Sequence, residues 1–290
     1  MKIRLLSATL AILLALGTYT RLAADTLSIY SPAMDRILPA AVVLPQSYHE
    51  SDTHYPVVYL LHGATGNYSN WLNLFPGNKN LLQQLADRHQ LIFVMPDGDP
   101  FGFYADSPRN PRSQFETHIS TEVVNYIDQH YRTIASAEGR AITGLSMGGH
   151  GALHIAIRRP GIFGAAGSMS GATSLDIKSW DLPAETLEGF SQQVNQALSD
   201  GNEDITEWLK QFSLTQSMEA FQLNPIPLII DCGTEDFFLN INRELRRKLL
   251  EAGVKHDYIE RPGAHNWAYW ERALPYQVLF FEEFFRKRVD

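Results

Sequence analysis

The stretch AITGLSMGGHGAL, residues 141–153, decides the fold. It places Ser146 inside a G-x-S-x-G pattern, between an apolar run that ends at Gly144 and a helical pattern that begins at Gly148. A strand that enters a helix through so sharp a turn holds the serine in a strained backbone conformation. Side chains at Gly144 and Gly148 would collide with the neighbouring strand and helix, so both positions require glycine.

Similar apolar runs occur on both sides of this stretch and predict further strands. The expected strands span residues 57–61, 91–95, 140–144, 227–231 and 256–260. The expected helices span residues 80–89, 117–131, 148–159, 241–252 and 276–288. This alternation is typical of an α/β protein with a mostly parallel central sheet and helices on both faces. Alternating apolar positions in residues 37–44 predict antiparallel edge strands ahead of the parallel core.

One segment interrupts the alternation. From about residue 172 to residue 222 the chain is polar and helix-prone, and it lies between two strands that should be neighbours. A connection of this length favours an insertion that forms a small cap over one end of the sheet. An elaborated crossover with no role at the site explains the segment equally well.

The N-terminus has the layout of an export signal. Lys2 and Arg4 precede an apolar run over residues 5–16, and the small residues Ala23 and Ala24 follow. The run is too short to cross a bilayer, which needs about 20 residues. We therefore expect a cleavable signal peptide over residues 1–24, a single domain over residues 25–290, a secreted or periplasmic protein and no stable membrane anchor.

Charge and cysteine content exclude several kinds of partner. Without residues 1–24, which contain three of the 24 basic residues and none of the 32 acidic ones, the net charge is −11. Such a surface repels phosphate backbones, so nucleic acid is not an expected partner. Cys232 is the single cysteine and cannot form an internal disulfide. His150 and His154 have metal-ligand spacing without a third ligand, so we expect neither a metal nor another cofactor.

Chemically useful side chains follow three of the expected strands. Ser146 follows residues 140–144, an acidic loop follows residues 227–231, and His265 follows residues 256–260. Parallel strands end at one edge of the sheet, so these loops should meet there. A serine, an acid and a histidine in this order are the parts of a nucleophile, its base and an orienting carboxylate.

The acidic loop offers three carboxylates. Asp231 should still belong to the strand, and Glu235 should point away from its neighbour, so Asp236 is the favoured partner of the imidazole. Among the ten histidines, only His265 combines a strand-end loop, a preceding Pro-Gly turn and a position after the acid. His62 is expected to orient the loop after residues 57–61 through hydrogen bonds.

These roles together predict ester chemistry. His265 would take the proton of Ser146 as the hydroxyl attacks an ester carbonyl, and Asp236 would hold the imidazole. The backbone N–H groups of Ala64 and Met147 would form an oxyanion hole. An acyl-enzyme would follow, which water or another alcohol then resolves.

Four stretches carry a resemblance to a known family. They are YPVVYLLHGATGNYSNW (55–71), GRAITGLSMGGHGAL (139–153), IDCGTEDFF (230–238) and PGAHNWAYW (262–270). From roughly Leu38 to the C-terminus the chain resembles the esterase D-like α/β-hydrolases. These include S-formylglutathione hydrolases, tributyrin-type and acetyl esterases, feruloyl esterases and mycolyltransferases. The resemblance implies the α/β-hydrolase fold, Ser146, Asp236 and His265 as the triad, and the same two oxyanion donors. Residues 172–222 match no recognisable cap of the family.

Aromatic residues near the expected site suggest a substrate platform, with Trp71, Trp180 and Trp267 as candidate substrate-binding residues. The wider set is Tyr68, Phe101, Phe103, Tyr104 and Trp270. Some of these rings are equally explained as ordinary core or rim aromatics. We expect a secreted esterase for short acyl or hydroxycinnamoyl esters, including carbohydrate-linked ones. The alternatives are an acyltransferase of the mycolyltransferase type and a thioesterase similar to S-formylglutathione hydrolase. The sequence favours no oligomeric state.

Overall fold

The computed structural model describes residues 24–199, 201 and 204–287. The expected signal peptide falls almost entirely outside these residues. Eight strands form the central sheet: β1 (Ala24–Ser31), β2 (Arg36–Val43), β3 (Val57–Leu61), β4 (Ile92–Pro96), β5 (Arg140–Gly144), β6 (Ala165–Met169), β7 (Leu228–Gly233) and β8 (Asp257–Arg261). Their spatial order is β1-β2-β4-β3-β5-β6-β7-β8.

The sheet is antiparallel only at its N-terminal edge. β1 pairs with β2, and β2 pairs with β4, in antiparallel registers, whereas every other neighbouring pair is parallel. The predicted architecture is therefore confirmed. The strands β3, β5, β6 and β7 are buried along their whole length, as parallel strands covered on both faces should be.

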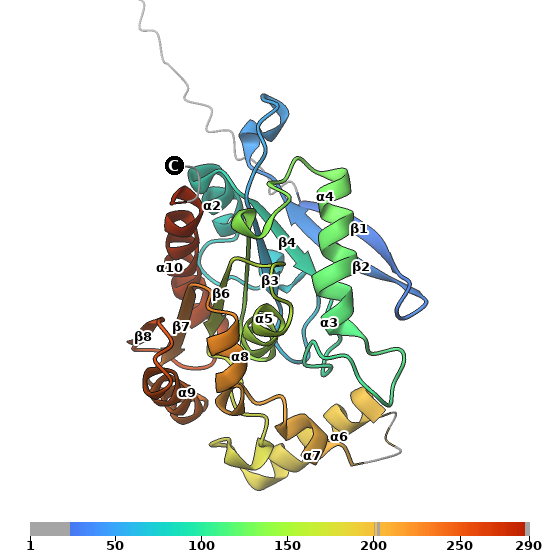
Figure 1. Cartoon of the computed structure of the whole chain (residues 1–290), viewed down its shortest axis with the longest axis vertical. Coiled ribbons are helices and arrows are strands. Elements are labelled where there is room, and N and C mark those ends of the chain that lie inside the picture. Colours follow the sequence, from blue (N-terminus) through green and yellow to red (C-terminus); the bar gives the residue numbers. More distant parts are fainter. Residues whose placement is uncertain (1–23, 200, 202–203, 288–290) are drawn as a thin grey trace, which may run out of the picture.

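Ten α-helices surround this sheet in the described part of the chain. They are α1 (Asn70–Asn73), α2 (Leu81–His89), α3 (Phe115–Thr117), α4 (Val124–His130), α5 (Met147–Arg158), α6 (Ala184–Ser199), α7 (Thr206–Lys210), α8 (Met218–Leu223), α9 (Leu239–Glu251) and α10 (Trp267–Arg286). Figure 1 shows α2 and α10 on one side of the sheet and α5 on the other. No helix in the described ranges has the length and apolarity to cross a membrane.

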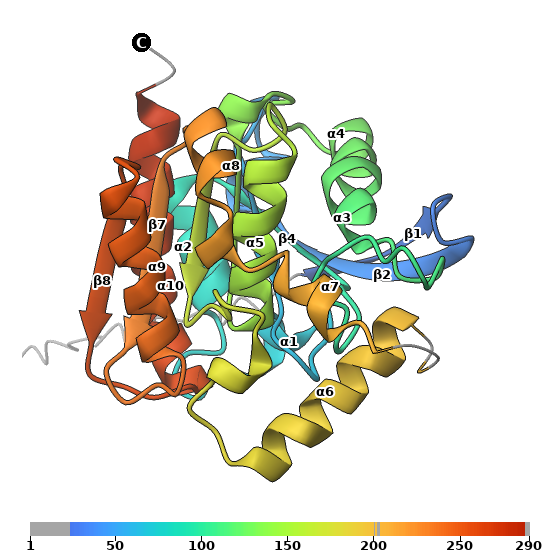
Figure 2. The same ribbon diagram turned by 60° about the horizontal axis from the view of Figure 1, so that its bottom comes forward.

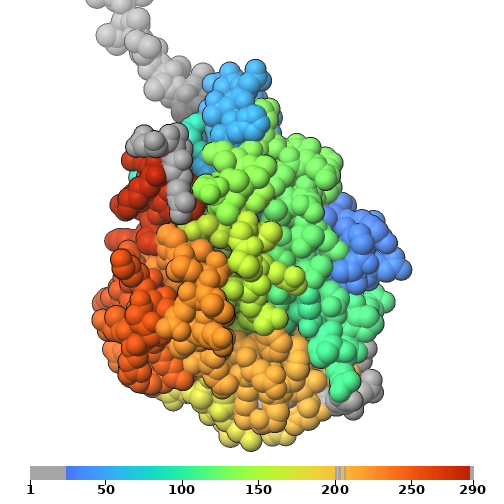
Figure 3. Space-filling model, viewed as in Figure 1, coloured from blue at the N-terminus to red at the C-terminus, as the bar shows by residue number. Residues whose placement is uncertain are grey.

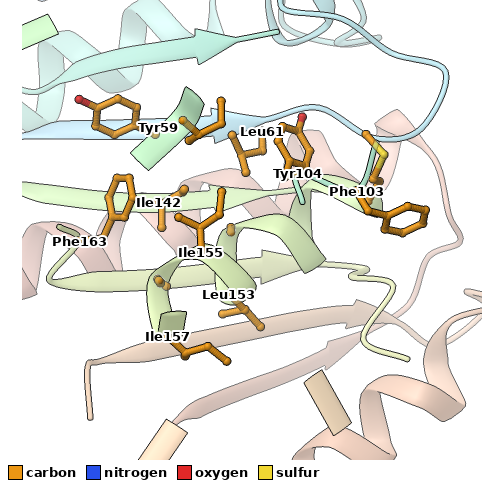
Figure 4. Packing of buried hydrophobic residues seen from close by; sticks show 14 of the residues in the cluster. Tyr59, Leu61, Phe103, Tyr104, Ile142, Leu153, Ile155, Ile157 and Phe163 are labelled. Atoms are coloured by element: carbon orange, nitrogen blue, oxygen red, sulfur yellow. The ribbon is translucent and has the colours of Figure 1, made fainter. Parts of the chain in front are cut away.

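Strand side chains alternate between two hydrophobic clusters. Tyr59 and Leu61 face one cluster with Leu153 and Ile155 of α5, as the close view shows (Figure 4). Leu60, which lies between them, faces the other cluster, which contains the apolar faces of α2 and α10. The two-residue period of the strands thus divides the core into two layers and holds the sheet edge rigidly between them.

The structure differs from the expected elements at three places. β6 was not predicted, because its sequence AAGSM consists largely of small residues that give no strong apolar run. The last helix begins at Trp267 rather than residue 276, because the Asn266 side chain caps it by accepting a hydrogen bond from Tyr269 N at 3.0 Å. The helix expected over residues 117–131 is divided by a π-helical turn over His118–Val123.

The insertion, residues 172–222, contains α6, α7 and most of α8. Figure 2 shows α6 crossing one end of the molecule, and in the space-filling view the same segment closes that end (Figure 3). Side-chain hydrogen bonds attach its described residues to the body. Ser107 and Asn110 donate to the carbonyls of Leu198 and Ala197 near the end of α6.

Candidate active site

Ser146 occupies the sharp turn between β5 and α5. Its backbone angles are φ 55° and ψ −120°, a conformation that residues with side chains rarely adopt. A Cβ atom on Gly148 would lie 2.4 Å from the Leu61 carbonyl oxygen, and one on Gly144 would lie 2.6 Å from Gly148. Both contacts are with backbone and cannot be relieved by a side-chain rotation. The steric reason predicted for these two glycines is confirmed.

The three residues expected to act together lie in one hydrogen-bonded chain. His265 Nε2 is 3.0 Å from Ser146 Oγ, and His265 Nδ1 is 2.9 Å from Asp236 Oδ2. Asp236 also accepts a hydrogen bond from Phe238 N at 2.8 Å, which fixes the carboxylate. The side chain of Asp236 is fully buried, whereas that of His265 is 14% exposed. The imidazole therefore connects a buried carboxylate to a hydroxyl at the sheet edge.

His62 is buried and its two ring nitrogens are both occupied. Nε2 lies 2.9 Å from Gly98 N, whose N–H must donate, so Nδ1 carries the proton and donates to Gly63 O at 2.9 Å. These bonds fix the loop after β3, where Ala64 lies. Among the described residues, neither Ala64 N nor Met147 N donates to a backbone acceptor. Both residues line the cavity beside Ser146, so their N–H groups remain available for an oxyanion.

The two other carboxylates of the acidic loop, Asp231 and Glu235, do not contact the imidazole. Asp231 is fully buried at the end of β7 and forms hydrogen bonds with Arg261 and Tyr269. Burial raises the pKa of the Asp231 carboxyl, while its two partners oppose that rise. Glu235 is exposed and accepts a hydrogen bond from Thr234 at 2.7 Å. Only Asp236 of the three contacts His265, so the structure places the carboxylates as the sequence suggested.

A cavity of about 600 Å³ opens over Ser146. The insertion supplies Trp180, Leu182, Thr186 and Phe190 to its wall. The described residues that line it include no Asp, Glu, Lys or Arg, and His265 is the one histidine among them. Its remaining polar side chains are those of Thr65, Asn70, Ser146, Thr186 and Asn266, and the rest of the lining is aromatic or apolar.

The expected aromatic platform is only partly present. Trp180 and Trp267 line the cavity, but Trp71 does not. The Trp71 ring is fully buried, packs edge to face on Phe75 and Trp267, and donates its Nε1–H to Leu61 O at 3.3 Å. The assignment of Trp71 to substrate binding is therefore wrong: this ring supports Trp267 from behind.

Sequence reasoning overlooked three aromatic rings of the site. Phe237 and Phe238 directly follow Asp236 and pack around His265, and Phe190 of α6 contacts Phe103 and Trp180 across the cavity wall. The position of Phe237 and Phe238 beside the acid was a usable signal. No local sequence signal pointed to Phe190, because its location depends on how the insertion folds back.

The paired histidines of α5 are packed rather than exposed. The rings of His150 and His154 stack at 5.3 Å, His150 Nε2 lies 2.9 Å from Phe212 O, and His154 Nε2 lies 3.3 Å from Glu116. The described residues contain no group of three His, Cys, Asp or Glu side chains arranged to hold a metal ion. Burial raises the pKa of the Cys232 thiol far above its ordinary range, which keeps it protonated.

The sheet order, the glycine-flanked turn and the strand-end loops define the α/β-hydrolase class. The chain belongs to the esterase family described as "Putative esterase", whose model matches residues 31–281. This confirms the resemblance to the esterase D-like branch.

Relatives and solved structures agree with this assignment. Esterase Rv1288 of Mycobacterium tuberculosis is 32% identical over 244 residues, which are 77% of this chain and 51% of that protein. The chain thus spans about half the length of this relative. The acetyl esterase of Caldicellulosiruptor saccharolyticus is 25% identical over 219 residues, 75% of this chain and 79% of that protein. A solved ferulic acid esterase structure has a TM-score of 0.74 and 26% identity, covering 90% of this chain and 98% of the other.

Proposed function

We propose that this protein hydrolyses carboxylic esters, with Ser146 as the nucleophile, His265 as the general base and Asp236 as the carboxylate that orients the imidazole. The observation that carries the proposal is the continuous hydrogen-bonded chain through these three side chains at the carboxyl edge of the sheet. Such a chain lets the imidazole accept the hydroxyl proton while the buried carboxylate stabilises the resulting positive charge.

The reaction then proceeds in two steps. Ser146 Oγ attacks the ester carbonyl, and the N–H groups of Ala64 and Met147 stabilise the negative charge that develops on the carbonyl oxygen. His265 donates the acquired proton to the leaving alcohol, which leaves an acyl group on Ser146. A water molecule, activated by the same imidazole, releases the acid and restores the enzyme.

The cavity supports neutral, partly aromatic substrates. Its lining is largely aromatic and apolar, with Trp180 and Trp267 among the candidate contacts. This favours short acyl or hydroxycinnamoyl esters, and the names of the similar acetyl and ferulic acid esterases point the same way. Glutathione carries two carboxylates and an ammonium group, for which the described lining offers no Lys, Arg, Asp or Glu side chain of opposite charge. The thioesterase alternative is therefore disfavoured.

The N-terminus and the insertion complete the proposal. Residues 1–24 would direct the chain to a secreted or periplasmic location and be removed, leaving residues 25–290 as one domain. The insertion would act as its cap, because its residues form one wall of the cavity. N-terminal sequencing of the exported protein tests the cleavage site near Ala24.

Replacing the nucleophile tests the central claim. Ser146→Ala should lower the rate of p-nitrophenyl acetate hydrolysis by at least about 10⁴-fold, because no other group can form the acyl-enzyme. The melting temperature should change little, since alanine keeps the backbone and loses one hydroxyl. Turnover near the wild-type rate would remove Ser146 from the mechanism.

A substrate panel then defines the substrate class. Acetyl, butyryl, feruloyl and glutathione thioester substrates should be compared with the same purified enzyme, with and without an added sugar alcohol. We expect hydrolysis of the neutral esters and no measurable action on the thioester. A transesterified sugar as the main product would indicate the acyltransferase alternative.

A further inference from the structure

Three aromatic rings enclose the His265 imidazole. The Phe237 ring centroid lies 4.3 Å from that of the imidazole, with 38° between the planes. Phe238 and Trp270 lie at 5.1 Å and 5.0 Å, both nearly perpendicular to the imidazole. The first separation is shorter than ordinary edge-to-face contacts between rings, and the 38° angle brings the pair nearer to a stacked than to an edge-to-face arrangement.

The same turn supplies the carboxylate and two of these rings. Asp236, Phe237 and Phe238 are consecutive, and Phe238 N donates to the Asp236 carboxylate at 2.8 Å. The two nitrogens of the imidazole face Asp236 and Ser146, so the rings occupy sides on which water would otherwise solvate the imidazole. When the imidazole becomes charged, the π-electrons of an adjacent ring face replace part of that lost hydration.

We propose that Phe237 is a positioning residue that stabilises the protonated form of His265 through its ring face, during and after proton transfer from Ser146. This rests on the proposed function, in which His265 is the base. An aliphatic side chain of similar size in place of Phe237 keeps the imidazole dry but offers no negative ring face. The positive imidazolium is then less stable, both in the resting enzyme at low pH and in the transition state.

Replacing Phe237 by an aliphatic residue leaves the other charged and titratable groups around His265 unchanged. Asp236 and Ser146 contact the imidazole directly. Glu235, on the same turn as Asp236, is exposed. Asp231, at the end of β7, forms its side-chain hydrogen bonds with Arg261 and Tyr269 and not with the imidazole. From α10, the contact with the imidazole is made by Trp270, which carries no charge.

The test is the pH profile of the Phe237→Leu variant. Because the imidazolium loses stability, the acidic limb of the kcat and kcat/KM profiles should move to lower pH by about 0.3–1 unit, and kcat on the plateau should fall about twofold to tenfold. Phe237→Tyr keeps a ring face and should restore both values. Phe237 is only partly buried, so these variants should fold, and Phe237→Met provides a second aliphatic variant.

Phe190→Leu is the matched control, since Phe190 also lines the cavity but packs on Phe101, Phe103 and Trp180 instead of His265. The Phe190→Leu variant should alter KM and leave the acidic limb of the pH profiles unchanged. An acidic limb that is unchanged or moves to higher pH in both the leucine and methionine variants would overturn the inference. Activity that survives in Ser146→Ala would instead overturn the proposed function, so the two failures are distinguishable.

Discussion

The sheet edge and the insertion are held in place by different means. At the sheet edge the main chain fixes the reacting groups. Ser146 N donates to Met169 O at 2.9 Å, and the loop after β7 bonds to the end of β8 through Thr234 N and to the loop after β8 through Glu235 N, both at 3.0 Å. Beyond its first two residues, the described part of the insertion relies on side chains, such as Ser107 and His150, that contact its carbonyl groups. The chemistry is therefore insensitive to most side-chain changes, while the cavity wall can vary with a few of them.

The largest effect should come from the sheet edge. Asp236→Asn should lower kcat by about 10⁴-fold, because the amide favours the wrong imidazole tautomer and cannot balance the imidazolium charge. Asp231→Asn should lower kcat much less and mainly reduce the free energy of unfolding, since it breaks a buried group with Arg261 and Tyr269. Steady-state kinetics and urea unfolding separate the two effects. The opposite order of kcat values would assign the catalytic role to Asp231.

An intermediate effect is expected where the insertion meets α5. Burial lowers the pKa of His150 to about 3, so the folded protein holds this imidazole neutral while the unfolded chain binds a proton below about pH 6.5. The stability that His150 contributes is complete above pH 6.5 and is lost progressively as the pH falls toward 3. By pH 4.5 the loss should reach about 2–3 kcal/mol.

The variant His150→Gln tests this acid sensitivity. Glutamine does not titrate and can still donate to Phe212 O, so the free energy of unfolding should fall less steeply between pH 6.5 and 4.5 than in the wild type. Urea unfolding at several pH values measures the slope. Since His154 still titrates in the variant, some slope should remain. Equal slopes for the two proteins would show that protonation of His150 is not linked to unfolding.

The smallest effect concerns one anchor of the insertion. Ser107 is buried, donates to Leu198 O and accepts from Asn110 N at 3.0 Å, so Ser107→Ala should cost about 1–2 kcal/mol of unfolding free energy. The exposed Ser179→Ala, within the insertion, is the control and should change it by less than about 0.5 kcal/mol. kcat should stay within about twofold in both variants. A large loss of kcat in Ser107→Ala would show that the insertion also positions the reacting groups.

The difference between the sheet edge and the insertion also explains which features could be predicted from the sequence. Glycines around Ser146 and polar residues at strand ends are local signals, because backbone geometry and parallel strand direction alone bring them together. β6 escaped prediction because small residues can be buried between two layers without an apolar run. Trp71 was wrongly assigned to the cavity and Phe190 was missed, because long-range packing, which no local pattern encodes, decides whether a ring faces a cavity or the core.

The absence of charged side chains from the described cavity lining has a consequence for the end of the catalytic cycle. In the proposed reaction a neutral ester enters, but the acid that is released ionises near neutral pH and becomes an anion. Neither a lysine nor an arginine in that lining holds the anion back, and the net negative charge of the chain repels it. Departure of the acid is thus favoured by the reaction itself, and accumulated acid should inhibit only weakly.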